Sequence, residues 1–345
     1  MWIFISANLF TNTPHSASQK YIQYTLGGEA SDLATLNSFQ SMAVLFTPIF
    51  GILMDKFYPM RLRIGPYLVV TEMIQIGCLL LIGTARLSMR TFMALRGVYT
   101  TAAITQAVIA MKTKLDIELK QKKKEFKDLR RELLPNQEQG EAKLMQNSAN
   151  NPEEVGIGVY ATFEAFSTIF AGLSLVLGGL LVDNLPNVKQ AFLVTMTPNL
   201  VLLFFSVMFL KEKRQNTSFP EGKSLKEISS GTFKVITSKG MLLPIMIVML
   251  INLAPSMAMA VNFITIKKVG WSYTQKGVVF AIQTFFMALI LLQINRLTKV
   301  FSFDLMVFLG VLAKSSGRML EVPLACVIFE GVGFAVMSIL NGLAF

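Results

Sequence analysis

The chain has 345 residues, of which 53% are hydrophobic and 15% charged, and its mean hydropathy is +0.53. A soluble enzyme carries about 25% charged residues, so the composition excludes a soluble protein and indicates an all-α, polytopic membrane helix bundle. The net charge of +11 does not indicate a nucleic-acid partner, because most basic residues lie between apolar segments, where membrane topology predicts them.

Disulfide and metal chemistry are excluded by the rarity of their ligands. The chain has two cysteines, Cys78 and Cys326, both within apolar runs, and one histidine, His15. This set fits neither a disulfide scaffold nor a zinc site. The sequence also holds no nucleophile–base set and no phosphate-binding loop, so we expect no enzyme, no cofactor and no metal.

Apolar segments long enough to span a membrane recur along the chain, since a spanning helix needs about 20 mostly apolar residues. Residues 1–13 are apolar but short, and we interpret them as the remnant of a first span. Further spans are predicted at about residues 33–54, 66–85, 91–111, 155–182, 189–210, 241–266, 277–294, 303–316 and 322–345. The sequence therefore predicts about ten spans.

Basic residues gather on alternate sides of these spans. With the remnant counted as helix one, the loops after helices two, four, six and eight hold 22 of the 32 Lys and Arg residues. The positive-inside rule places these loops in the cytoplasm or its matrix or stromal equivalent. We expect an integral membrane protein in contact with lipid, and an organellar inner membrane is one candidate location.

The longest polar segment, residues 112–154, follows helix four. Its first part has helix-forming composition, and Pro135 is expected to end that helix. This basic helix is either a solvated extension of helix four or a lysine-rich face for anionic lipid or a partner. The residues beyond Pro135 predict a mobile linker between two halves. The expected order is 1–111 with helices one to four, 112–154 with the basic helix and linker, 155–210 with helices five and six, 211–240 as a polar loop, and 241–345 as a shortened C-terminal half.

A candidate gate or latch lies between the second and third predicted spans. Gly51 and Asp55 end the second span, and Arg61 and Arg63 precede the third. A glycine lets two helices approach closely, and a carboxylate at a helix end can bind a guanidinium or the backbone N–H groups of a neighbouring helix. Such a contact would hold one state of a rocking transporter, and the alternative is an ordinary charged turn.

Several collinear segments resemble one transporter family. FTPIFGILMD at 46–55, with RLR at 61–63 and PYL at 66–68, is similar to the helix two to three signature of the folate–biopterin transporters, a branch of the major facilitator superfamily. The later matches are GGLLVD at 178–183, APS at 254–256, VGWS at 269–272, NRL at 295–297, and Glu330, Gly331, Phe334, Ala335, Met337, Ser338 and Asn341. The resemblance implies a major-facilitator-like bundle in two halves and a folate- or pterin-like solute.

The chain also departs from this family. Thr47 stands where the family typically has a basic residue, and Gln106 is the strongly polar group in a stretch of helix four that typically carries aspartates. Met257 and Met259 occupy a region where the family tends to place another acid. Only about thirty residues separate Arg296 from Glu330, so we expect the usual twelve helices to be shortened to about ten.

Polar groups inside apolar spans are expensive in lipid and are therefore candidate functional residues. The candidates for a solute cavity are Glu72, Gln75, Gln106, Glu164, Asn252, Asn262 and Gln283. The alternative for each is a structural contact between helices. Arg96, Lys314 and Glu330 are further charged groups within spans, and snorkelling to the membrane surface accounts for the last two.

Two functions of different classes follow. The family resemblance implies a secondary transporter of a pteridine-like solute, with its site at the midplane between the halves. The loss of intramembrane charges and helices instead favours a scaffold that no longer transports and serves as an accessory subunit of a larger membrane complex. Asp55, Glu72 and Glu164 favour transport, and the balance of the sequence narrowly favours the scaffold.

Overall fold

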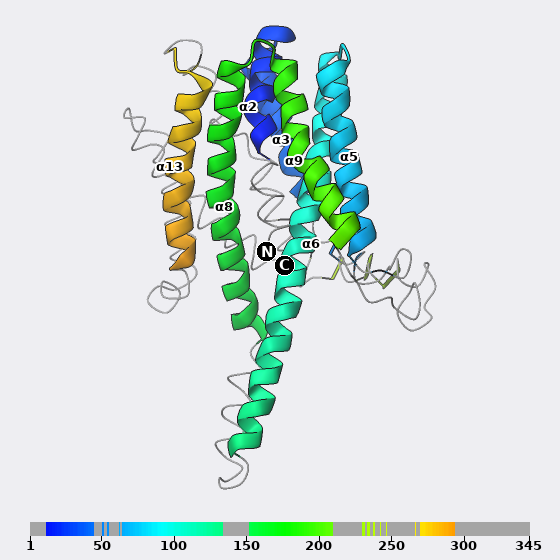
Figure 1. Cartoon of the computed structure of the whole chain (residues 1–345), viewed down its shortest axis with the longest axis vertical. Helices are drawn as coiled ribbons and strands as arrows, with labels where there is room; N and C mark the ends of the chain where they lie inside the picture. The colour runs from blue at the N-terminus through cyan, green and yellow to red at the C-terminus, as the bar shows by residue number, and fades with distance from the viewer. Residues whose placement is uncertain are drawn as a thin grey trace.

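The computed structural model describes residues 12–44, 64–133, 152–209 and 270–293, together with isolated positions between and beside these ranges. All regular structure in these ranges is helical. The helices are α2 (Thr13–Lys20), the π-helical turn η1 (Tyr21–Thr25), α3 (Ala30–Val44), α5 (Gly65–Thr84), α6 (Met89–Leu133), α8 (Pro152–Asn184), α9 (Val188–Phe209) and α13 (Tyr273–Leu292). They stand side by side in one bundle, from which α6 projects at one end (Figure 1).

Four helices in the described ranges are long and apolar enough to cross a membrane, which agrees with the predicted class of an all-α membrane bundle. They are Gly65–Thr84, Thr162–Asn184, Val188–Met208 and Tyr273–Leu292. These correspond to the third, fifth, sixth and eighth predicted spans. The spans predicted at 241–266, 303–316 and 322–345 fall almost wholly outside the described residues, so the total of ten stays a prediction.

Two helix ends differ from the predicted ones. The predicted first span ends near residue 13, but the structure has helix from Thr13 through α2 and η1 to Thr25, before Gly27 turns the chain with a φ of +65°. The eighth helix begins at Tyr273 rather than at 277. In both places polar side chains interrupt the apolar pattern, but tertiary contacts bury them. Hydropathy alone therefore predicts an end before residue 25 for the first helix and a start after Tyr273 for the eighth.

The basic segment after helix four continues the same helix. α6 runs without a break from Met89 to Leu133, and α8 begins at Pro152, a residue that suits the first turn of a helix. α8 packs against α2, and α9 packs against α5. The described helices on both sides of the segment therefore pack into one bundle. The predicted linker lies outside the described residues and stays a prediction.

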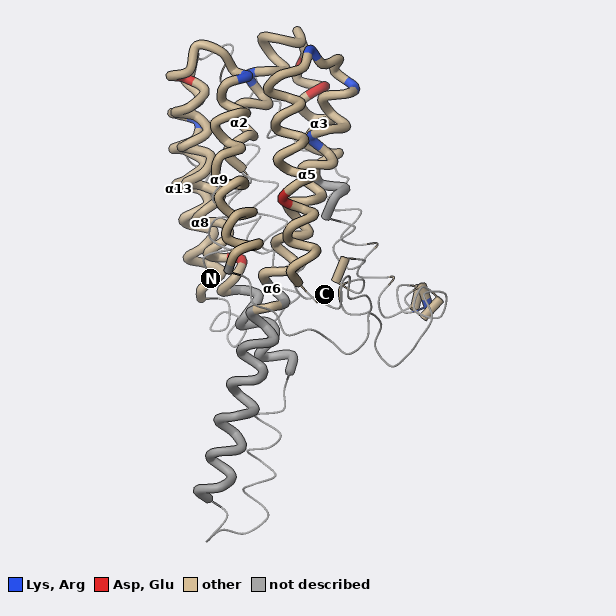
Figure 2. The backbone as a smooth tube through the Cα atoms, turned by 45° about the vertical axis from the view of Figure 1, so that its right-hand side comes forward, with Lys and Arg blue, Asp and Glu red and all other residues tan. Residues whose placement is uncertain are grey.

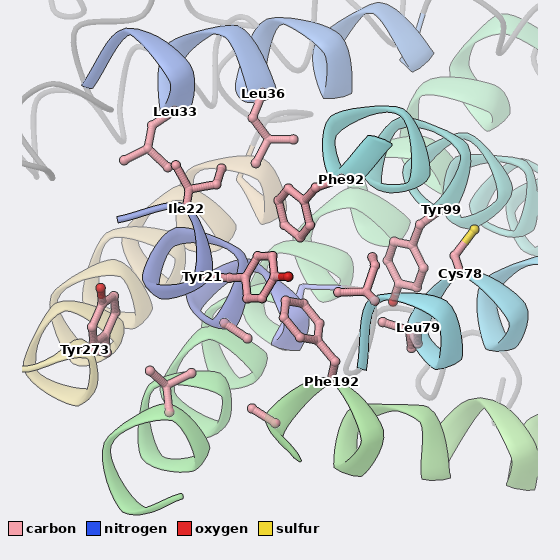
Figure 3. Packing of buried hydrophobic residues seen from close by; sticks show 14 of the residues in the cluster. Tyr21, Ile22, Leu33, Leu36, Cys78, Leu79, Phe92, Tyr99, Phe192 and Tyr273 are labelled. Carbon is pink, nitrogen blue, oxygen red and sulfur yellow. The ribbon is translucent and has the colours of Figure 1, made fainter. Parts of the chain in front are cut away.

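Aromatic side chains fill the centre of the bundle where η1, α6 and α9 meet. The Tyr21 and Phe92 rings lie 5.0 Å apart between centroids, and Phe192 packs edge-on to Tyr21 at 6.0 Å. All three side chains are fully buried, and Leu33 of α3 and Leu79 of α5 extend the cluster (Figure 3). This packing fixes η1, and with it α2, against α6 and α9, which positions the polar groups described below.

Among the residues that Figure 2 colours, the charged ones lie mostly at the end of the bundle that holds the α5–α6 and α8–α9 turns. Two lysines there bind the last carbonyl groups of neighbouring helices. Lys20 Nζ donates to the Val182 oxygen at 2.7 Å, and Lys189 Nζ donates to the Ala85 oxygen at 2.6 Å. Because a helix C-terminus carries partial negative charge, each contact ties one helix end to another at the edge of the bundle.

Candidate functional site: buried polar groups between the helices

Glu72 lies at the centre of a polar cluster inside the bundle. Its side chain is 0% exposed on α5, and the Gln106 side chain of α6, itself buried, lies beside its carboxyl group. Within the described part of the chain, neither carboxyl oxygen of Glu72 makes a hydrogen bond of regular geometry. The Gln106 Nε2 group makes none either. The structure thus brings together two of the predicted cavity residues without satisfying them.

Gln75, one turn along α5 from Glu72, extends the cluster to α9. Asn199 Nδ2 donates to Gln75 Oε1 at 3.4 Å, and the Asn199 side chain also interacts with the hydroxyl of Tyr99 on α6. Gln75 Nε2 has no partner among the described residues. Three helices therefore contribute polar side chains to one buried region.

Arg96 lies on the same face of α6 as Tyr99. It is 2% exposed, and its guanidinium carbon lies over the Tyr99 ring, 4.8 Å from the centroid. Its Nε and Nη1 atoms are buried without a hydrogen-bond partner in the described ranges. A buried ion without a partner costs several kcal/mol, so charged groups held in this way within a membrane are candidates for binding or coupling.

A second polar contact joins α2 to α13. His15 and Gln19 lie one turn apart on α2, and Gln23 follows in η1. The Gln19 amide bonds the His15 ring at 3.0 Å, its oxygen accepts a hydrogen bond from Lys276 Nζ, and Tyr273 Oη donates to Gln23 Oε1 at 2.8 Å. These side chains account for both differences in helix ends, because each polar group that broke the apolar pattern has its partner on the other helix.

α8 and α13 approach closely along glycines. A Cβ built at Gly179 would lie 2.5 Å from the Tyr273 oxygen, and one at Gly277 would lie 2.6 Å from the Leu175 oxygen. No larger residue fits at either position without movement of backbone. Small residues at helix interfaces allow such close approach within membranes.

Asp183, at the end of α8, caps the start of α13. Its carboxylate accepts hydrogen bonds from the Thr274 backbone N–H at 2.8 Å, from the Thr274 hydroxyl at 2.7 Å and from the Tyr273 backbone N–H at 3.3 Å. Ser272 completes the cap through a reciprocal pair of hydrogen bonds with Gln275. A carboxylate is favourable there because the helix N-terminus is positive. The contact is a latch of the kind predicted for Asp55, at another helix end.

The predicted gate falls mostly outside the described residues. Asp55, Arg61 and Arg63 are not described, and Gly51 lies in helix with no described atom within 4 Å of a Cβ built on it. Close helix approach is seen instead at Gly179 and Gly277. The gate therefore stays a prediction.

The remaining cavity candidates are scattered. Asn252 and Asn262 lie outside the described residues. Glu164 is partly exposed on α8, beside Ala165, which packs against α13, and Gln283 is buried on α13. The described structure thus assembles Glu72, Gln75 and Gln106 and leaves Glu164 and Gln283 apart from them.

Sequence reasoning missed most of the partners of these residues. Asn199 was overlooked within an apolar span, although the adjacent Pro198 marks the same turn of α9 as irregular. Gln19 and Lys276 fall outside the predicted spans, because the first span is predicted to end before Gln19 and the eighth to begin after Lys276. The signal that could have found them is a polar residue just outside each of two predicted span ends, since two such residues can bind each other when both helices are longer than hydropathy indicates.

Comparison with known proteins supports the fold. No family model matches the sequence, and no curated protein matches it. The crystal structure of the nucleoside transporter NupG is similar, with a TM-score of 0.56 and 12% sequence identity, over 99% of this chain and 86% of that chain. A mutant of NupG gives a TM-score of 0.55 and the same identity, over 99% of this chain and 87% of that chain.

The protein is therefore an integral membrane bundle of helices whose fold is similar to that of NupG. The all-helical architecture and the apolar spans agree with that class. Likeness at 12% identity concerns the fold alone and does not select a family within it.

Proposed function

We propose that the protein is a secondary transporter of a small polar solute. The observation that carries the proposal is the buried cluster around Glu72, where several polar atoms within membrane-spanning helices lack partners among the described residues. A structural subunit gains nothing from such groups, since unpaired polar atoms lower stability. In a transporter the missing partners are a solute, a coupling ion or water.

Glu72 is the residue we assign to binding or coupling. It lies near the middle of α5, and Gln75, Gln106 and Asn199 surround it with hydrogen-bonding groups from three helices. The cluster is enclosed, so the structure corresponds to a state in which this site is closed to solvent. A carboxyl group in this setting can exchange a proton or bind a solute N–H group when the helices move.

A folate- or pterin-like compound is the solute class that the sequence resemblance favours. The segments at 46–55, 178–183 and 269–272 support membership in the folate–biopterin branch of this fold. The similar structures are of a nucleoside transporter, and nucleosides also carry a planar nitrogen heterocycle. The pterin ring presents N–H donors that suit a carboxylate, and we therefore place pterins first and nucleosides second.

The competing function is the transport-degenerate scaffold, acting as an accessory subunit of a membrane complex. The sequence favours it through the thinned polar groups of helix four and the Met257–Met259 region. The buried cluster around Glu72 weighs against it. The two functions differ in whether Glu72 affects flux or only assembly.

Reconstitution into liposomes tests the proposal. We expect saturable counterflow uptake of labelled biopterin or folate by the wild-type chain, and a loss of about tenfold or more in Glu72→Gln. Glu29→Gln, at an exposed acid in the turn before α3, is the matched control and should leave uptake unchanged.

Absence of saturable uptake for folate, biopterin and nucleosides would contradict the proposal. The scaffold then predicts that the gently purified protein migrates within a large complex. In that case Glu72→Gln should change assembly or stability alone.

A further inference from the structure

The free polar atoms around Glu72 have a definite pattern of donors and acceptors. Both carboxyl oxygens of Glu72 are acceptors, and neither makes a hydrogen bond within the described structure. The Nε2 groups of Gln75 and Gln106 are donors, and both are likewise without a partner there. The three side chains are at most 1% exposed. Two acceptor atoms and two amide donors are therefore buried close together without satisfying one another.

Packing between α5 and α6 places Glu72 level with Gln106. The two helices contact each other and run antiparallel, since a short turn joins them (Figure 1). Leu68 of α5 and Ile109 of α6 belong to one buried cluster. Glu72 follows Leu68 by one helical turn. Gln106 precedes Ile109 by about one turn, so it meets Glu72 in the next layer of the contact.

The free atoms fit an organic solute better than a metal cation. A cation beside Glu72 needs further oxygen ligands. The Gln75 oxygen already accepts a hydrogen bond from Asn199 Nδ2 at 3.4 Å. The atoms of Gln75 and Gln106 that lack partners are N–H donors, which repel a cation. A solute edge that combines N–H groups with an acceptor satisfies both kinds of free atom.

We propose that Glu72 and Gln106 bind the amino–oxo edge of a guanine-type ring in the transported solute. The proposal rests on the proposed transport function and names the part of the solute that the Glu72 site binds. This edge presents an amino group, a ring N–H and a carbonyl oxygen in a row, in guanine and in the pterin ring alike. The carboxylate accepts from the two N–H groups, and Gln106 Nε2 donates to the carbonyl oxygen.

Gln75 adds a donor to the same site. It lies about one turn from Glu72 on α5, and its Nε2 group is buried and unpaired in the described structure. Guanine and pterin both carry ring nitrogens that accept hydrogen bonds. The hydrogen bond from Asn199 holds the oxygen of the Gln75 amide, so the N–H groups are the ones left for a ring nitrogen.

This pattern discriminates among nitrogen heterocycles. Uracil places an oxygen, and adenine a C–H group, where guanine has its amino group, so neither satisfies both carboxylate oxygens. Hypoxanthine is the sharpest comparison, because it keeps the carbonyl and the ring N–H of guanine and lacks only the amino group. A buried acceptor left without its donor costs binding energy. We therefore expect the site to prefer guanosine to inosine.

Binding to the purified full chain tests this preference without requiring transport. Ligand-induced thermal stabilisation is measured for guanosine, inosine, uridine and biopterin over a range of concentrations. We expect guanosine to bind the wild type about tenfold or more tightly than inosine, because a hydrogen bond to a carboxylate is lost with the amino group. Uridine should bind no better than inosine, and biopterin should compete with guanosine.

Two substitutions assign the parts of the edge to residues. Glu72→Gln keeps the shape of the side chain and one acceptor, so guanosine and inosine should then bind with similar affinity. Gln106→Met removes the donor to the carbonyl oxygen, which both nucleosides carry, and should weaken both by a similar factor of about threefold or more. Glu29→Gln and Gln190→Met change exposed side chains in the same way and should bind every probe like the wild type.

Equal affinity of the wild type for guanosine and inosine would overturn the inference, as would failure to bind any probe. A preference for guanosine that Glu72→Gln keeps in full would also overturn it. If Glu72→Gln fails to fold, the guanosine-to-inosine ratio of the wild type and the Gln106→Met variant decide by the same readout.

The inference and the transport function fail separately. A preference for the amino group that depends on Glu72 supports the ring site even when liposomes show no uptake. Saturable uptake without that preference supports transport and removes this inference.

Discussion

The contact between α8 and α13 and the interior between α5, α6 and α9 are built on opposite principles. In the first, glycines bring backbones together, and both carboxylate oxygens of the exposed Asp183 accept hydrogen bonds from the start of α13. In the second, Glu72, Gln75 and Gln106 are buried but keep polar atoms without described partners. The acid at the surface is therefore paired, whereas the buried acid is not.

This difference indicates which part of the fold is rigid and which part can rearrange. Satisfied polar groups and close backbone packing hold one end of the bundle shut. The interior contains polar groups without described partners. Their hydrogen bonds can be completed by a solute or by another arrangement of the helices. Substitutions in each region test this difference.

The largest effect is expected at the glycine contact. Gly277→Ala places a methyl group against the Leu175 backbone, which cannot move as a side chain can, so we expect a loss of about 1–3 kcal/mol in the free energy of unfolding. Gly97→Ala on α6 is the control, because a Cβ there meets no atom within 4 Å in the described structure. It should be neutral or stabilising by up to about 1 kcal/mol, as alanine favours helix.

Thermal unfolding in detergent, followed by the fraction of protein that stays monodisperse, measures both variants. Equal stability of Gly277→Ala and Gly97→Ala would mean that the close contact between α8 and α13 does not hold the fold.

An intermediate effect, of opposite sign in the two regions, is expected from the same acid-to-amide change. Asp183→Asn weakens three hydrogen bonds at the start of α13 and should cost about 1–2 kcal/mol. Glu72→Gln replaces a carboxyl group that has no hydrogen-bonded partner in the described structure, and it should leave stability unchanged or raise it by about 1 kcal/mol.

The same unfolding assay compares the two amide variants. A loss of stability in Glu72→Gln as large as that in Asp183→Asn would show that Glu72 has a structural partner. The division between a held region and a functional interior would then disappear.

The smallest effect is expected from single-cysteine substitutions, which test on which side of the membrane the Asp183 contact lies. Single cysteines at Ser88, Ser148 and Ser218, in a background without the two native cysteines, should stay folded, since Ser88 is exposed in the α5–α6 turn and the others lie in polar loops. The positive-inside rule predicts that Ser148 and Ser218 are labelled from one side and Ser88 from the other. Labelling of Ser148 and Ser218 from opposite sides would contradict the helix count.

The sequence determined the membrane class and much of the helix arrangement. Long apolar runs leave no soluble fold open to the chain, and they located α5, α8 and α9 to within a few residues of their observed ends. It also singled out Glu72, Gln75 and Gln106, since a strongly polar residue in an apolar span is visible without any contact being known.

Only the tertiary structure decided which polar residues meet. Gln19 and Lys276 are separated by more than 250 positions, and hydropathy treats each as the end of a span, yet each supplies the other's partner inside the bundle. Asp183 and Asp55 follow glycine-containing segments of similar pattern, and only packing shows that Asp183 caps α13. A one-dimensional pattern records the cost of burying a polar group, whereas the partner that offsets the cost comes from a distant part of the chain.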